Sequence, residues 1–186
     1  MRSFELGLRT EILSGKKLGL VYFDNSINNI ADKYNGNYAF VDTEQKGVEF
    51  SLNGLLRQDL IFNISYTYLD ATITDGFYFG GGSGTKGDRL IRRPKHKLIA
   101  NLLWKYNENI NFGLNLMQAI DREDWGASEV GDFEDITLLK LTSSVRLSEN
   151  NSLLFRIDNL LNDQYDWTGG YPGAQRSFLI GLNMKF

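Results

Sequence analysis

Apolar and polar side chains alternate residue by residue over many stretches of this chain. The C-terminal run shows this most clearly, because its apolar members would share one strand face: Phe178, Ile180, Leu182, Met184 and Phe186. A period of two indicates a β-strand whose two sides meet different environments. About ten residues of this kind are enough to cross a bilayer as a tilted strand. The pattern favours antiparallel β structure with one apolar and one polar surface.

The same alternation recurs along the chain and predicts about nine strands. They cover approximately residues 3 to 13, 17 to 26, 46 to 56, 60 to 70, 96 to 106, 110 to 120, 136 to 147, 151 to 158 and 176 to 186. Short polar turns alternate strictly with long loops. The long loops cover about residues 27 to 45, 71 to 95, 121 to 135 and 159 to 175. All short turns therefore lie at one end of the sheet.

This sorting of connections by length is typical of outer-membrane barrels, which have short periplasmic turns and longer extracellular loops. Aromatic residues make up 13% of the chain, and no apolar run approaches the roughly 18 residues of a membrane-spanning helix. The expected fold is all-β: a segment of an antiparallel transmembrane β-barrel.

The odd strand number indicates that this segment does not close on itself. Bacterial single-chain barrels have even strand numbers, and an open edge in lipid leaves backbone groups unpaired at several kcal/mol each. We expect residues 1 to 186 to be one unit, the C-terminal part of a larger barrel. Its remaining strands would join the two free edges.

Composition argues against several other classes of function. The absence of cysteine excludes thiolate metal sites, and a net charge of -3 provides no basic excess for nucleic acid. The single histidine, His96, would need a nucleophile such as Ser83 or Ser128 beside it to form a hydrolase site. We expect no enzyme, no catalytic residue and no cofactor. The acidic stretch 121 to 135 matches no EF-hand spacing, so solvated charges are preferred over a metal site.

Several segments resemble the TonB-dependent outer-membrane receptors. Residues 158 to 165 (DNLLNDQY), followed by 169 to 178 (GGYPGAQRSF) and the terminal strand, are similar to the C-terminal signature of that family. The segment RPKHK at 93 to 97 looks like its R-x-P-x-H strand opening, and KGVEF at 46 to 50 looks like its K-G-x-E pattern. These ordered matches extend over most of the chain.

The resemblance implies a barrel of about 22 strands around a plug domain. Such receptors take up scarce ligands, such as ferric siderophores, haem, cobalamin or sugars, with energy from the TonB system. The expected location is the bacterial outer membrane, with lipid and lipopolysaccharide as neighbours. TonB would act only through the plug, which this chain lacks together with the N-terminal barrel strands.

Candidate ligand contacts lie in the long loops, which would face the outside. Aromatic side chains there could grip a ligand by stacking, or could pack the loops together. Arginines could attract an anionic chelate, or could pair with lipopolysaccharide or with the neighbouring acidic loop. The candidates are Phe77, Tyr78, Phe79, Arg92, Arg93, Trp125, Trp167 and Tyr171.

Two other classes stay open at this point. A soluble β-sandwich or lipocalin-like binding protein would show one apolar inner face and would need no detergent. A small complete outer-membrane protein would need an even strand number.

Overall fold

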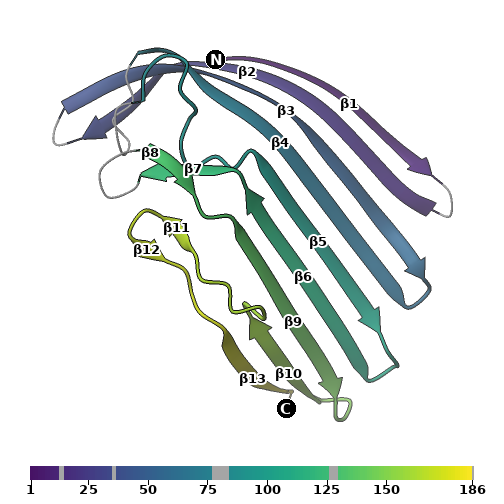
Figure 1. Ribbon diagram of the computed structural model, residues 1–186. Coiled ribbons are helices and arrows are strands. Elements are labelled where there is room, and N and C mark those ends of the chain that lie inside the picture. The colour runs from purple at the N-terminus through teal and green to yellow at the C-terminus, as the bar shows by residue number, and fades with distance from the viewer. Residues whose placement is uncertain (13–14, 35–36, 77–83, 126–129, 186) are drawn as a thin grey trace.

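The computed structural model describes residues 1–12, 15–34, 37–76, 84–125 and 130–185. Within these ranges the chain forms a nine-stranded antiparallel sheet with the order β1-β2-β3-β4-β5-β6-β9-β10-β13 (Figure 1). Its strands are β1 (Arg2–Ile12), β2 (Lys16–Tyr34), β3 (Asn37–Arg57), β4 (Leu60–Gly76), β5 (His96–Lys105), β6 (Ile110–Ile120), β9 (Ile136–Arg146), β10 (Asn151–Asp158) and β13 (Ser177–Met184). The prediction of an all-β antiparallel segment of about nine strands is confirmed.

Two small hairpins interrupt the simple succession of strands. One joins β7 (Arg122–Trp125) to β8 (Val130–Phe133), and the other joins β11 (Asp166–Thr168) to β12 (Tyr171–Pro172). Both emerge from the end of the sheet that carries the long connections (Figure 1). In the described part of the chain, no helix has the length and apolar character needed to span a membrane.

The predicted long loops are partly wrong. Residues 27 to 45 are mostly strand, because β2 and β3 continue beyond the apolar alternation and pair as far as Tyr34 with Asn37. β4 likewise continues to Gly76. The extensions of β2 and β3 mix polar and apolar residues on both sides and contain a bulge between Ile27 and Ile30, so their sequence lacks the clean period of two on which the strand prediction depended.

Cross-strand register separates the side chains into an apolar face and a polar face. One rung of the apolar face contains Leu52, Ile64, Ala100, Leu116 and Leu139. The adjacent rung of the polar face contains Asn53, Asn63, Asn101, Asn115 and Lys140. A slip of one residue would exchange the two faces, so the alternation specifies the register.

Aromatic side chains form two groups on the apolar face. Towards the long connections, the Tyr66 hydroxyl lies 2.7 Å from His96 Nδ1. Towards the short turns, the Trp104 ring packs against Tyr106 and Phe112 at centroid distances of 5.2 and 5.8 Å. About eight residues of β5 separate the groups, roughly 27 Å along a tilted strand. That spacing fits the aromatic girdles that flank the apolar band of outer-membrane barrels.

Candidate functional site

Two of the long connections fold over the polar face at one end of the sheet. Leu90 packs with Val41, Ala71 and Ile73, at the upper ends of β3 and β4. Tyr165 packs with Ala119 and Ile136, at the corresponding ends of β6 and β9. Because Ala119 is an even number of residues from Asn115 on the same strand, it lies on the polar face. Both connections therefore turn inward over this face and away from the apolar one.

The segment that precedes β5 connects β4 with β7 through backbone hydrogen bonds. The Leu90 amide donates to the Ala71 carbonyl at 2.8 Å, and the Ile73 amide donates to the Asp88 carbonyl at 2.9 Å. On the other side, the Arg92 amide donates to the carbonyl of Glu123 at 2.9 Å. The segment therefore bridges β4 and β7.

Charged side chains reinforce the same bridge. Arg89 Nη1 lies 2.7 Å from Asp121 Oδ1 and 2.7 Å from Glu123 Oε1. The Arg89 hydrogen bond lowers the pKa of the Asp121 carboxyl, with a smaller contribution from the charge of Lys95. Burial opposes the charge of Arg89, but the hydrogen bond to Asp121 and both acidic neighbours outweigh it and raise the pKa of Arg89. The acidic and basic stretches thus neutralise each other.

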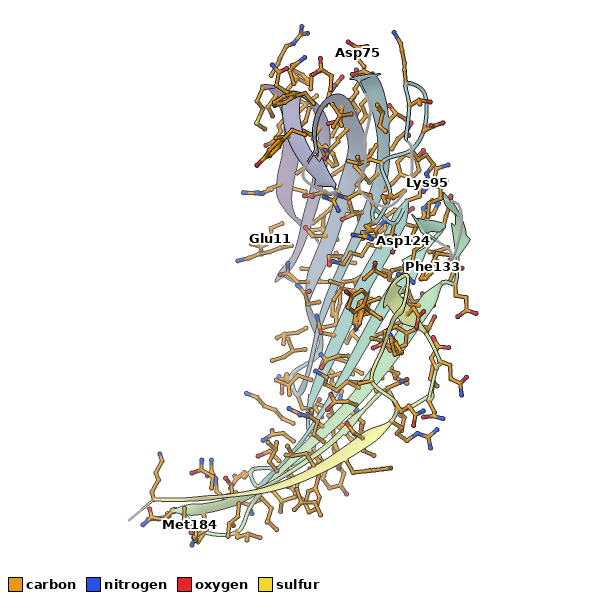
Figure 2. The ribbon with its side chains drawn as sticks, turned by 90° about the vertical axis from the view of Figure 1, so that its left-hand side faces the viewer. Glu11, Asp75, Lys95, Asp124, Phe133 and Met184 are labelled. Carbon is orange, nitrogen blue, oxygen red and sulfur yellow. The ribbon has the colours of Figure 1, made fainter. Side chains whose placement is uncertain are left out.

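Two charged side chains of β7 are almost completely buried. Asp124 is 2% exposed and Arg122 is 8% exposed. Asp124 Oδ1 accepts from Arg92 Nε at 2.9 Å, and Asp124 Oδ2 accepts from the Gly169 amide at 3.1 Å. Arg122 donates to three backbone carbonyls, and burial lowers its pKa against the opposing charge of Asp124. β7 therefore contacts both of the other long connections, at the level of the sheet where Figure 2 labels Asp124.

The DNLLNDQY segment is a compact turn organised by asparagine side chains. Asn159 and Asn162 have φ of 50° and 56°, which asparagine tolerates better than most residues. Buried Asn159 donates from Nδ2 to the carbonyls of Asp163 at 2.9 Å and Ala174 at 3.1 Å. In turn, the Asp163 amide donates a hydrogen bond to Asn159 Oδ1. This turn directs the following chain back over the polar face.

Tyr165 anchors the β11–β12 hairpin to that face. Its carbonyl accepts from the Gly173 amide at 2.7 Å, and its ring meets Trp167 edge to face with centroids 5.1 Å apart. Tyr165 is 8% exposed, whereas Trp167 is 51% and Tyr171 is 69% exposed. The hairpin therefore presents aromatic surface to the space beside the sheet.

The predicted site residues have different outcomes. Trp167 and Tyr171 lie together on the β11–β12 hairpin. Arg92 pairs with Asp124, while Arg93 donates to the Arg92 carbonyl and has no ion pair within the described ranges. Phe77, Tyr78 and Phe79 lie outside the described residues, as does the side chain of Trp125. Of the predicted set, the structure thus links Arg92 to the Trp167 hairpin.

Sequence reasoning did not identify the organising roles of Arg122, Tyr165 and Asn159. The available signal was the Arg-x-Asp pattern of 122 to 124, which puts opposite charges on one strand face. Ser83 and Ser128, the nucleophiles that a hydrolase site would need beside His96, lie outside the described residues. Among the described side chains, no three His, Asp or Glu residues gather as a metal site.

Two curated relatives match nearly the whole of this chain. The vitamin B12 transporter BtuB of Vibrio cholerae is 26% identical over 184 residues, covering 94% of this chain and 28% of the relative. The metal-pseudopaline receptor CntO of Pseudomonas aeruginosa is 24% identical over 201 residues, covering 100% of this chain and 27% of the relative. The chain thus spans less than a third of the length of either curated relative.

Solved structures share the fold. The siderophore receptor PiuA from Acinetobacter baumannii superposes with a TM-score of 0.80 at 19% identity, covering 99% of this chain and 28% of that one. The ferric citrate transporter FecA gives a TM-score of 0.77 at 19% identity, covering 99% and 31%. A family model described as TonB dependent receptor-like, beta-barrel matches residues 1–172. The chain therefore belongs to the TonB-dependent receptor β-barrel family.

Proposed function

We propose that this chain is the C-terminal barrel segment of an outer-membrane receptor that takes up a scarce ligand with energy from TonB. The observation that carries this proposal is the inward folding of two long connections over the polar face, with Trp167 and Tyr171 exposed beside it. In a barrel, that face lines the lumen. The exposed rings would stand at the mouth through which a ligand enters.

The apolar face would contact lipid. Its two aromatic groups, around His96 and around Trp104, would lie at the two membrane interfaces. Above the upper group, Lys46 lies 2.9 Å from Glu44 and 3.9 Å from Asp24. This mixed-charge region would meet lipopolysaccharide.

The rest of the receptor would complete the barrel and fill it. Within the described residues, β1 pairs only with β2 and β13 pairs only with β10. Such edges are costly in lipid, because each unpaired backbone group costs several kcal/mol. Further strands would cover both edges, and a plug domain would occupy the lumen and connect it to TonB.

The ligand would be a metal complex of the iron-chelate, haem or cobalamin class. BtuB is described as a vitamin B12 transporter and CntO as a metal-pseudopaline receptor. Exposed rings at Trp167 and Tyr171 suit stacking on a planar or aromatic chelator, and Arg93 supplies a positive charge for an anionic one. This role requires binding and passage and no bond chemistry.

Uptake by the complete receptor tests the proposal. A strain lacking the full reading frame would be complemented with wild-type or Trp167→Ala/Tyr171→Ala receptor and supplied with radiolabelled cyanocobalamin, ferric citrate, ferric catecholate or haem. We expect wild type to restore accumulation of one of these compounds and the double variant to lose at least about tenfold. Tyr106→Ala, one residue beyond the short-turn end of β5, is the matched control. If the deletion strain accumulated all four compounds to the same level as the strain complemented with wild-type receptor, the proposal would be overturned.

A further inference from the structure

The β11–β12 hairpin has little internal support. Its ladder contains only the pairs Asp166 with Pro172 and Thr168 with Tyr171, and the register is irregular between them. Proline has no amide hydrogen to donate, and an isolated two-stranded hairpin is marginal in water. Contacts outside the hairpin must therefore hold it in one position.

Arg122 supplies the first of these contacts. Its Nη2 donates to the carbonyl of Asp166 at 3.0 Å and to that of Trp167 at 2.7 Å. Its Nη1 donates to the carbonyl of Glu134 at 2.7 Å, and its guanidinium lies over the ring of Phe133 at 5.2 Å. One buried side chain thus ties the backbone of β11 to the β7–β8 hairpin.

Asp124 supplies the second contact, at the tip of the hairpin. Its Oδ2 accepts from the Gly169 amide, which directly precedes Gly170 at φ of 80° in the turn. Its other oxygen accepts from Arg92 Nε. Because Asp124 is two residues from Arg122 on one strand, both side chains reach the same side of β7. Two residues of β7 therefore hold both parts of the β11–β12 hairpin: Arg122 holds β11, and Asp124 holds the turn at Gly169.

We propose that Arg122 and Asp124 are positioning residues that hold the β11–β12 hairpin, and with it Trp167 and Tyr171, in the orientation from which the rings meet a ligand. This rests on the proposed function, since it assigns no ligand of its own. Tyr165 fixes the base of the connection on the sheet, and the two β7 side chains fix the part beyond it. Without them the rings would sample many orientations, and binding would cost additional ordering entropy.

Amide hydrogen exchange on the complete receptor in detergent micelles, without added ligand, tests this assignment. Arg122→Lys keeps the charge but loses the planar fork that reaches several carbonyls, and Arg122→Met loses both. We expect exchange of the amides at 166 to 170 to rise in Arg122→Lys, and to rise further, by about tenfold or more, in Arg122→Met. Arg146→Lys, at an exposed position of β9, is the control.

Asp124 allows a sharper discrimination. Asp124→Asn keeps an oxygen acceptor for Gly169, whereas Asp124→Ala removes it. We expect the Gly169 amide to stay largely protected in Asp124→Asn and to exchange about tenfold faster in Asp124→Ala. Asp70→Asn, an exposed carboxylate of β4, controls for the loss of charge alone.

Acrylamide quenching of Trp167, in a receptor background with Trp104, Trp125 and every other tryptophan changed to Phe, gives an independent reading. Quenching should increase in Arg122→Met. Unchanged exchange at 166 to 170, or equal loss of protection in β6 and β9, would overturn the assignment. The exchange measurement contains no ligand, so it is independent of the uptake experiment. If the Arg122 variants exchange faster at the hairpin but the wild-type receptor restores no uptake, the proposed function is wrong and the positioning role still holds.

Discussion

At the end of the sheet that carries the long connections, single residues stabilise the structure mainly through close steric and hydrogen-bond contacts. Gly173 shows this best, because an added Cβ would overlap the Tyr165 ring. The glycine at this position is thus explained by the lack of space beside a buried tyrosine. Asn159 similarly combines a positive φ with bonds to two carbonyls, a demand that few other side chains satisfy.

Gly173→Ala should therefore displace Tyr165 from its place on the sheet. We expect a loss of about 1 to 3 kcal/mol in local stability, the usual cost of overpacking a tight site. Hydrogen exchange of the amides at 165 and 173 in the complete receptor measures this loss. Gly181→Ala, where the added methyl finds its nearest atom at 3.8 Å, should change little. Equal effects of the two variants would contradict the steric explanation.

The Arg89–Asp121 pair should make the bridge between β4 and β7 sensitive to acid. The bond from Arg89 lowers the pKa of Asp121, so its contribution is fully present above the ordinary value near 3.8 and is lost as pH falls through the lower folded value. Protection of the Arg92 amide, corrected for intrinsic exchange, should therefore fall only below about pH 4. Asp121→Asn should remove this step. A step that persists in the variant would assign the effect to another carboxyl.

At the scale of elements, strands were predicted where apolar and polar residues alternate along the chain and missed where they do not. β5 and β6 alternate cleanly, and their register follows from that alternation. The outer halves of β2 and β3 mix polar and apolar residues on both sides, so the sequence offered no periodic signal there. The β7–β8 and β11–β12 hairpins depend on contacts between distant segments, which a local pattern does not contain.

The bulge in the β2–β3 hairpin depends on one carboxylate. Asp42 accepts from the Asn29 amide at 2.8 Å and from Asn28 Nδ2 at 2.8 Å, while Asn29 has φ of 57°. Asp42→Ala should leave the Asn29 amide unpaired and speed its exchange by about tenfold. Asp42→Asn retains an acceptor and serves as the control. If both variants exchange like wild type, the bulge is held by the strand ladder alone.

At the scale of the whole molecule, the fold and its two faces were predictable from the sequence, and the geometry of the loop end was not. Alternation and turn length depend on neighbouring residues, so they predict strands, faces and the sorting of the connections. The meeting of Arg92, Asp124 and Gly169 joins three separate connections. Only the folded arrangement brings these residues together.

Closure of the barrel should depend on strands that cover β1 and β13. We expect this chain alone, refolded in detergent, to lack the heat-modifiable electrophoretic migration of a closed barrel, because both edges stay unpaired. Supplying the remainder of the receptor as a second polypeptide should restore it. A chain that stays folded and monomeric in plain buffer would contradict the membrane assignment itself.

The asparagine rung of the polar face extends further than its four amides. Near the short turns, Lys17 lies opposite Asn53 on β3 and opposite Glu11 on β1 in the strand register. At the other side of the sheet, Lys140 Nζ lies 3.5 Å from Asp158 Oδ1, and Asp158 lies opposite Ser177, where β13 begins. Strands in a barrel tilt by about 35 to 45°, so a row at right angles to them climbs as it goes round. In a barrel, this row of hydrogen-bonding groups would therefore follow a helical path around the inner surface. In the proposed receptor, a hydrated solute that moved along this row would exchange one polar partner for the next without meeting an apolar stretch.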